Sequence, residues 1–366
     1  MTLPRPVVSL PRRRPSDDLS PSLSTSPFLN HGTYKGRRSS SGNHRTLTST
    51  TTRTTITNQI GRGLHWILFK RNALWILLLL ISLWFNWLHW NHKINVKLHQ
   101  TVPLSIRSTL SSPHSNLKHL VMVPGHAIWT GCEANKAMQD DTWILEDLQK
   151  GGDVRAYIKH ITKGAEIAVK DPQALLIFSG GMTRAHTDAT EAISYYRLAK
   201  AGNIFSQFMN SQDKIEGQAD FDRVTTEDYA LDSYENVLFS IARFKEFTGR
   251  YPEFITAVGY GMKRQRYQDV HRAAARWPSH KFKYIGIDND HEVEADYKGE
   301  LEFGLKPWQQ DVYGCKGLLL EKRKKRNIYR RFHPYHSSAP ELTGLMEHCP
   351  VNNEWFEGRL PWTTDT

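Results

Sequence analysis

Four short segments hold most of the residues that could do chemistry, and each follows an apolar run. The segments are Pro124–His126, Ser179–Gly181, Gly259–Gly261 and Asp288–His291. In a parallel α/β sheet the carboxyl ends of the strands meet at one edge, where ligands bind. Glycine at such a turn lets backbone N–H groups approach an anion closely. The spacing therefore predicts a ligand crevice, and the predicted binding residues in these turns are Gly125, Ser179, Gly180 and Gly181.

The candidate acid–base groups are His126, Glu191 and Glu227. An unperturbed histidine has a pKa near neutral pH, which suits a general base; the other interpretation of His126 is a hydrogen-bonded turn residue. Glu191 stands three residues after Asp188 in capping-box form, so it is either a cap or a catalytic carboxylate. A second helix start is predicted at Asp232–Glu235. Glu227, Glu235 and Asn236 straddle it, where they either cap the helix or face the crevice.

A third chemical feature is the acidic cluster that follows the last predicted strand. Asp288, Asp290 and His291 are candidate metal ligands, because the oxygen ligands of this cluster suit Mg²⁺ or Mn²⁺. The other interpretation is a solvated loop. None of the glycine turns matches the dinucleotide fingerprint or the P-loop. The cofactor stays open between a divalent metal and a nucleotide-like ligand.

Basic residues open the predicted helix at 263–277. Lys263, Arg264 and Arg266 fall in its first turn, where the helix dipole already places about half a positive charge. A sequence selected only for stability would favour acidic residues there. The three charges therefore predict an anion site that also uses backbone N–H groups. The alternative is that the side chains point outward along a solvated face.

Apolar runs and helical stripes alternate between residues 118 and 295, as in an α/β domain. The predicted strands are 120–123, 175–178, 254–258 and 282–287. The predicted helical faces lie within 143–148, 158–168, 189–196, 237–244 and 263–277. This alternation implies right-handed crossovers and a three-layer sandwich around a mostly parallel sheet. Beyond residue 300 no regular period occurs, and the basic run Lys322–Arg326 is interpreted as a solvated surface.

One segment, Asn72–Trp90, contains no Asp, Glu, Lys or Arg. Its length is about that needed to cross a hydrocarbon core of ~30 Å, so it is predicted to be a transmembrane signal anchor. Lys70 and Arg71 precede it, and positive charge is biased to that flank. This bias predicts a cytosolic N-terminus and places residues 91–366 in the lumen of the ER or Golgi.

The remaining segments follow from composition. The predicted parts are a disordered basic tail rich in Ser, Thr and Pro (1–62), a stalk (91–117), the α/β domain (118–295) and an irregular C-terminal extension packing on it (296–366). The Arg and Ser content of the tail also resembles a mitochondrial transit peptide. Its prolines interrupt an amphipathic helix, so mitochondria are the alternative location.

Charge is divided unevenly along the chain. Residues 1–71 hold 12 Lys and Arg against 2 acidic residues, whereas the remaining 295 residues hold 36 basic and 35 acidic residues. A nucleic-acid binder would carry its positive field on the folded domain, so this class is disfavoured. Cys315 and Cys349 either form a disulfide in an oxidising lumen, leaving Cys132 free, or all three are unpaired small apolar residues.

The order of these motifs resembles the SanA/YdcF/ElyC domain family, a domain of unknown function. The resemblance covers about residues 118–290, and its most specific part is Glu227-x-x-Ala-x-Asp-Ser-x-Glu235-Asn236. Ser179–Gly181 with Glu191, and Arg266 after a later strand, also match. The resemblance implies a Rossmann-like domain, usually tethered to a membrane outside the cytosol, with links to cell-envelope biosynthesis and nucleotide-like ligands. The chain departs from the family at Pro124–His126, where glycines are typical, and at Lys263, where a histidine is typical.

Two functions follow as hypotheses. The first is a membrane-anchored hydrolase or transferase for a phosphate- or pyrophosphate-bearing substrate, such as a lipid-linked precursor or nucleotide conjugate. Glu191 and Glu227 would be acid–base groups or metal ligands, and His126 a base, while Asn236 would orient the substrate. The second, motivated by the missing family histidine, is a non-catalytic ligand-binding or scaffolding module of the endomembrane system.

Overall fold

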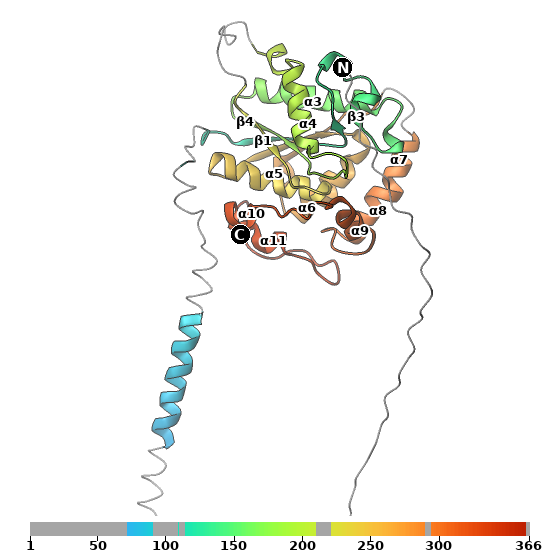
Figure 1. Ribbon diagram of the computed structural model, residues 1–366. Coiled ribbons are helices and arrows are strands. Elements are labelled where there is room, and N and C mark those ends of the chain that lie inside the picture. Colours follow the sequence, from blue (N-terminus) through green and yellow to red (C-terminus); the bar gives the residue numbers. More distant parts are fainter. Residues whose placement is uncertain (1–71, 91–108, 110–113, 210–220, 290–293, 364–366) are drawn as a thin grey trace, which may run out of the picture. The chain divides into compact units, whose positions relative to one another are not determined.

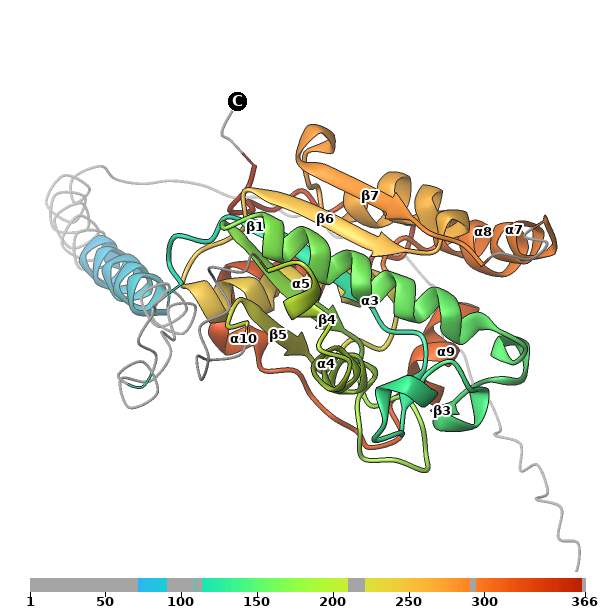
Figure 2. The same cartoon turned by 90° about the horizontal axis from the view of Figure 1, so that it is seen from above.

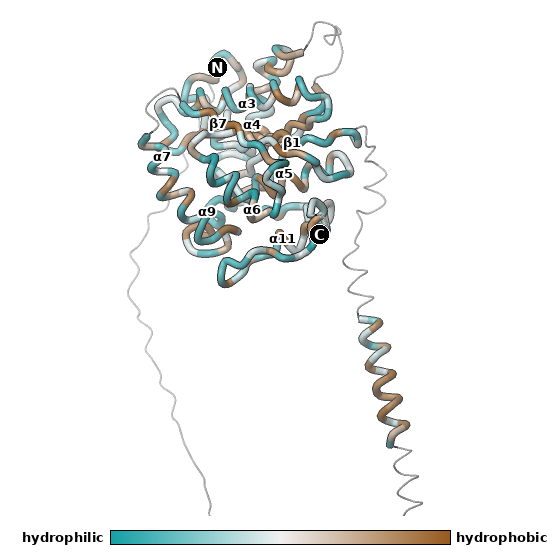
Figure 3. Tube along the Cα trace, turned by 180° about the vertical axis from the view of Figure 1, so that it is seen from behind, coloured by the Kyte–Doolittle hydropathy of each residue, from teal (hydrophilic) through white to brown (hydrophobic). Residues whose placement is uncertain are grey.

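The computed structural model describes residues 72–90, 109, 114–209, 221–289 and 294–363. Within these residues one helix, Asn72–Trp90, is long and apolar enough to span a membrane, and it covers the predicted range. Its large apolar side chains are exposed, and Figure 3 shows hydrophobic residues along most of its length. The predicted tail at 1–62 and most of the predicted stalk lie outside the described residues.

A five-stranded parallel sheet forms the centre of the α/β domain, in the order β5-β4-β1-β6-β7. The strands are β1 (His119–Pro124), β4 (Ala174–Ser179), β5 (Val224–Glu227), β6 (Phe254–Gly259) and β7 (Phe282–Gly286). The sequence predicts four of these strands and misses β5. That strand reads Val-Thr-Thr-Glu, so it lacks the continuous apolar run of a strand buried on both faces.

Helices cover both faces of this sheet, which makes the predicted three-layer sandwich (Figure 1). On one face α3 (Asp153–Lys170) and α4 (Glu191–Ala201) share a buried cluster with Val121 and Val123 of β1. On the other face, α5 (Ser233–Thr248) shares a cluster with Leu120 and Met122. Alternate residues of β1 thus point to opposite layers, and Figure 2 shows α3 running along the sheet.

The predicted inward face of the helix at 189–196, through Ala192, Ile193 and Tyr196, is confirmed only in part. Ala192 is buried, but Ile193 is exposed and Tyr195 is buried instead. The N-cap of α4 is Thr190, whose hydroxyl accepts a hydrogen bond from the backbone N–H of Ile193 at 2.9 Å. The predicted capping box from Asp188 is therefore absent. Glu191, the first residue of the helix, is left free of a capping role.

The predicted helical face at 143–148 is also wrong. Trp143–Ile144 forms a short strand, β3, which pairs antiparallel with β2 (Ile128–Trp129). Leu148 is 97% exposed. Three apolar residues do not distinguish a helix from a strand by period. The burial of Trp143, whose indole donates to the Ala137 carbonyl at 2.8 Å, comes from tertiary contacts.

The C-terminal extension packs against the α5 face, and it is largely helical rather than irregular. Its main elements are α7 (Glu294–Glu300), η8 (Leu301–Leu305), α8 (Lys306–Gln310), α9 (Gly317–Arg326), α10 (Tyr335–Ser338) and α11 (Thr343–Met346). Most are only one or two turns long, so they carry no period that a sequence reveals.

A disulfide joins Cys315 to Cys349, and Cys132 is free and exposed.

Candidate functional site

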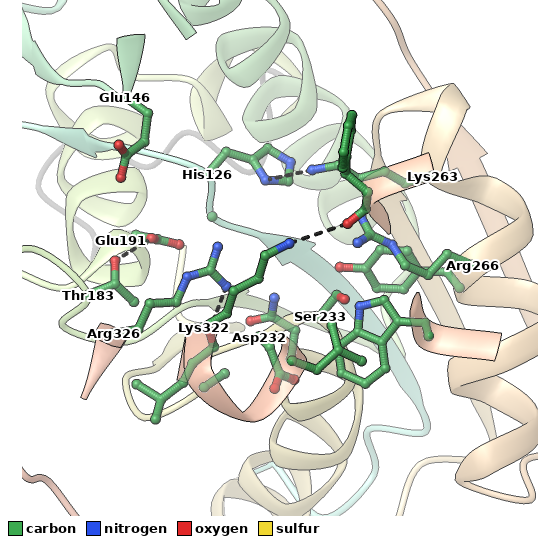
Figure 4. Close-up of a pocket in the computed structure, with 18 of the residues that line it drawn as sticks. His126, Glu146, Thr183, Glu191, Asp232, Ser233, Lys263, Arg266, Lys322 and Arg326 are labelled. Atoms are coloured by element: carbon green, nitrogen blue, oxygen red, sulfur yellow. Dashed lines mark hydrogen bonds between the residues drawn. The ribbon is translucent and has the colours of Figure 1, made fainter. Parts of the chain in front are cut away.

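A cavity of about 210 Å³ opens at the carboxyl edge of the sheet. The segments that follow β1, β4, β5 and β6 all contribute to its lining, and α9 closes another side (Figure 4). The crevice predicted from the strand ends is therefore present. Its charged lining residues are Arg184, Lys263, Arg266, Lys322, Arg326, Glu146, Glu191 and Asp232.

The glycine turns do not offer free backbone N–H groups to this cavity, contrary to the prediction. Each N–H already donates to a backbone carbonyl at 2.7–3.0 Å, and only Gly125 of the three glycines lines the cavity. The three bonds run from Gly125 to Ser179, from Gly180 to Glu227 and from Gly181 to Ala230. These turns therefore join neighbouring strand ends to one another.

The same glycines make room for Glu191. A Cβ on Gly125 would lie 2.5 Å from the Cβ of Glu191, and a Cβ on Gly180 would lie 2.8 Å from its Oε2. Both distances are too short for a side chain at either glycine. The hydroxyl of Thr183 donates to Glu191 Oε1 at 2.7 Å, and both residues line the cavity. The side chain of Glu191 is therefore held in place in the wall of the cavity.

His126 and Lys263 meet in the cavity, with Lys263 Nζ 3.4 Å from His126 Nδ1. Burial lowers the pKa of His126 well below its ordinary value, and the charge of Lys263 lowers it further. Burial also lowers the pKa of Lys263 to about 8, with Arg266 adding to the shift. At neutral pH the pair is a neutral imidazole that accepts from an ammonium. This geometry suits His126 to orient Lys263 rather than to abstract a proton with Nδ1.

Only two of the three basic residues predicted to bind an anion line the cavity. Arg266 does, but it ion-pairs with Glu300 of α7 at 3.1 Å, and both side chains are about 90% buried. Arg264 does not; its guanidinium donates to the carbonyl of Tyr284 at 2.6 Å. The helix opens as a 3₁₀ turn, Gly261–Lys263, and continues as a π-helical stretch at 266–271. The regular first turn assumed from the sequence is therefore absent.

Helix α9 supplies two cavity cations, Lys322 and Arg326, from the run interpreted as a solvated surface. Lys322 Nζ donates to the carbonyl of Phe303 at 3.3 Å. The guanidinium of Arg326 donates to the carbonyl of Leu231 at 2.8 Å. Within the described parts of the chain, neither has a carboxylate partner. Burial lowers the pKa of Lys322, and the charge of Arg326 adds to the effect. The interpretation of this run as solvated is wrong for Lys322, which is half-buried, whereas Arg326 is exposed but still lines the cavity.

Arg323, between these two, fastens α9 to the start of α5. It lies 2.6 Å from Asp232 and 3.1 Å from Glu235. Asp232 is also the N-cap of α5, accepting from the backbone N–H groups of Tyr234 and Glu235. The predicted helix start at Asp232 is thus confirmed, and its carboxylates hold the C-terminal extension in place.

Glu227 lies behind the wall of the cavity, fully buried, and does not line it. Its carboxylate accepts hydrogen bonds from Ser179 Oγ at 2.7 Å, Tyr335 at 3.1 Å, and the N–H groups of Tyr229 and Ala230 at 2.8 and 3.3 Å. Ser179 Oγ also lies 2.8 Å from Asn236 Oδ1. Asn236, in the first turn of α5, lines the cavity, whereas Ser179 and Glu227 do not.

Burial raises the pKa of Glu227 to about 7, which predicts a stability that falls as pH rises. The unfolded chain ionises this group near its ordinary pKa of about 4.3. Between the two values the unfolded state loses the proton first, so unfolding becomes easier by about 4 kcal/mol in total. We expect the free energy of unfolding of wild type, relative to Glu227→Gln, to decline between about pH 4.3 and 7 and to be flat above. Urea titrations at several pH values measure this difference, and a pH-independent difference would contradict it.

The metal prediction gains no support from the described residues, among which no group of three His, Cys, Asp or Glu side chains is placed to hold an ion. Asp288 accepts hydrogen bonds from the backbone N–H of Met262 at 3.3 Å and from the hydroxyl of Tyr297 at 3.0 Å. Asp290 and His291 lie outside the described residues. Metal binding there stays a prediction.

The structure brings together His126, Glu191, Asn236, Lys263 and Arg266, as the sequence predicts. It adds Lys322 and Arg326, which the sequence analysis missed. The signal available was the spacing of four residues between Lys322 and Arg326, which places both on one face of a helix. Arg184 was also missed, and its ion pair with Glu146 joins two separate loops.

The comparisons with known proteins give a likeness without an activity. No family model matches the chain, and no solved structure matches it. A protein of Saccharomyces cerevisiae (strain ATCC 204508 / S288c), described as "Uncharacterized protein YOR238W", is 28% identical over 298 residues. The matched region is 67% of this chain and 97% of the yeast protein. The chain is therefore similar to almost the whole of a yeast protein whose description names no reaction.

Proposed function

We propose that the cavity binds a phosphate-bearing ligand. The observation that carries this proposal is the set of three cations, Lys263, Lys322 and Arg326, which line the cavity without a carboxylate partner among the described residues. Lys263 follows β6, whereas Lys322 and Arg326 belong to α9. Burial lowers the pKa values of both lysines, and neighbouring cations lower them further. Like charges held together in a partly desolvated space repel one another. A bound anion would replace this repulsion with attraction.

A phosphate suits these cations better than a single carboxylate does. It carries up to two negative charges near neutral pH and three strong acceptor oxygens. An ammonium and a guanidinium donate several charge-assisted hydrogen bonds to such oxygens. Lys263, Lys322 and Arg326 can therefore be satisfied together by one phosphate group.

Removing one of these cations is expected to weaken phosphate binding. We expect Lys322→Ala or Lys263→Ala to raise the Kd for inorganic phosphate about 10-fold each, the loss of one charge-assisted hydrogen bond. Isothermal titration calorimetry of the full chain in a non-ionic detergent measures this. The matched control is Lys324→Ala in the same helix, whose exposed side chain pairs with Glu321. Equal affinities for all four proteins would contradict the proposal.

Glu191 favours a second candidate function, a hydrolase or transferase for phosphate esters. Its carboxylate accepts a hydrogen bond from Thr183 in the wall of the cavity that the cations also line, whereas Glu227 does not line the cavity. As an acid–base group it would act on a water or hydroxyl next to the bound phosphate. The expected result for Glu191→Gln is loss of turnover of p-nitrophenyl phosphate with phosphate binding retained. Retained turnover would contradict the catalytic role, and an inert wild type would leave a binding module.

The location of the domain is part of the proposal. The helix Asn72–Trp90 is long and apolar enough to anchor the chain, and the positive flank favours a cytosolic N-terminus. The disulfide Cys315–Cys349 suits an oxidising compartment such as the ER or Golgi lumen. The resemblance to the SanA/YdcF/ElyC family implies the same side of a membrane and stays a prediction. The state of this disulfide in cells is the test, described in the Discussion.

A further inference from the structure

We infer that the ligand is a phosphorylated polyol, whose phosphate lies against Lys263, Lys322 and Arg326 and whose hydroxyl groups donate to Glu191. This inference rests on the proposed phosphate site and names its substrate class. It starts from a feature that phosphate binding alone leaves unexplained. A carboxylate stands inside a cavity that is otherwise suited to an anion.

The carboxylate of Glu191 is kept apart from the cations of the cavity. None of Lys263, Lys322 and Arg326 forms an ion pair with it in the described residues, and Arg184 pairs with Glu146 instead. Oε1 accepts from Thr183, whereas Oε2 has no hydrogen-bond partner among those residues. Figure 4 shows Glu191 and Thr183 on one side of the cavity, Lys263 and Arg266 on the other, and Lys322 and Arg326 between them. Glu191 therefore does not serve to neutralise the cations.

The side chain of Glu191 packs closely against two glycines. A Cβ on Gly180 would lie 2.8 Å from Oε2, and a Cβ on Gly125 would lie 3.0 Å from it. Gly180 also has a φ of +154°, which L side chains rarely adopt. The Cβ of Glu191 would lie 2.9 and 2.5 Å from the same two positions, so both glycines are needed for the side chain of residue 191 to lie between the two turns. Capping does not explain the carboxylate at its end, since Thr190 already caps α4.

An ionised carboxylate repels a nearby phosphate unless the ligand itself presents donors to the carboxylate. Hydroxyl groups are such donors, and their hydrogen bonds to a charged group are stronger than those between neutral groups. Asn236 and Ser233 add further polar groups to the lining. The cavity volume of about 210 Å³ suits a compact ligand. A small ring or chain that carries both a phosphate and hydroxyls meets all of these conditions.

The test compares two ligands that differ only in hydroxyl groups. Myo-inositol 1-phosphate and cyclohexyl phosphate carry the same phosphate on the same six-membered ring. We expect the full-length protein in detergent to bind the inositol ester about 10- to 100-fold more tightly, the range for a hydrogen bond to a charged group. Glu191→Ala is expected to remove this preference. Lys322→Ala is expected to raise the Kd for both esters by the same factor, so the ratio of the two Kd values stays as in the wild type.

The outcomes separate this inference from the proposed function. Equal affinities of the wild type for the two esters would overturn the polyol inference and leave the phosphate site standing, and this comparison needs no variant that might misfold. A preference that survives Glu191→Ala would also overturn it. If the wild type binds neither ester nor inorganic phosphate, the proposed function itself fails.

Discussion

Replacing both Cys315 and Cys349 with serine is expected to lower the free energy of unfolding by about 4 kcal/mol. The two residues are 34 positions apart, and the disulfide closes a loop of that length in the unfolded chain. Loop-closure entropy gives about this value for such a loop. The closed segment contains α9, so the bond also keeps Lys322 and Arg326 with the domain. Chemical denaturation of the full chain, with and without a reductant, measures the change.

The free cysteine provides the matched control. Cys132 is exposed and unpaired, so Cys132→Ser is expected to change stability by less than about 0.5 kcal/mol. Reduced wild type should match the double variant, because both lack the cross-link. In cells, an oxidised Cys315–Cys349 pair supports a lumenal domain, whereas thiols that are fully reduced in cells but oxidise readily in vitro would point to the cytosol.

Replacing Arg323 with alanine is expected to lower the free energy of unfolding by about 3–5 kcal/mol at pH 8, the range for breaking a buried ion pair. The substitution would leave Asp232 and Glu235, which are 9% and 13% exposed, without their cation. Burial and the neighbouring charge of Asp232 raise the pKa of Glu235. Without Arg323, protonation of Glu235 would relieve part of the repulsion. Because the pKa of Glu235 is already about 8 with Arg323 present, the loss is expected to be smaller at pH 7 than at pH 9.

The neighbouring residue gives the comparison for this variant. Lys324 is in the same helix, but its side chain is 61% exposed and pairs with Glu321 within α9. Lys324→Ala is expected to cost about 0.5 kcal/mol or less, as surface pairs do. If Arg323→Ala were as stable as Lys324→Ala, the ion pairs to Asp232 and Glu235 would not be what holds α9. A weaker affinity for inorganic phosphate in Arg323→Ala would show that this anchor also positions Lys322 and Arg326.

The fold could be predicted where one periodic pattern repeats over many residues. Continuous apolar runs such as Leu175–Phe178 indicate strands buried on both faces, because both layers need apolar contacts there. The stripe of α5 and the helix start at Asp232 are confirmed for the same reason, since capping and amphipathicity are local properties. The strand β5 and the pair β2–β3 could not be predicted, because β5 lacks a continuous apolar run and strands of two residues show no period.

The sequence by itself determined the α/β sandwich, the apolar helix Asn72–Trp90 and the place of the crevice, because parallel strands all end at one edge. Only the tertiary structure decided which side chains face that crevice. It buried Glu227 behind the wall, seated Glu191 against two glycines and paired Arg266 with Glu300. It also brought Lys322 and Arg326 more than 130 residues along the chain to the loops after β1 and β4. Such contacts depend on packing between distant segments, and no local pattern of charge or period encodes them.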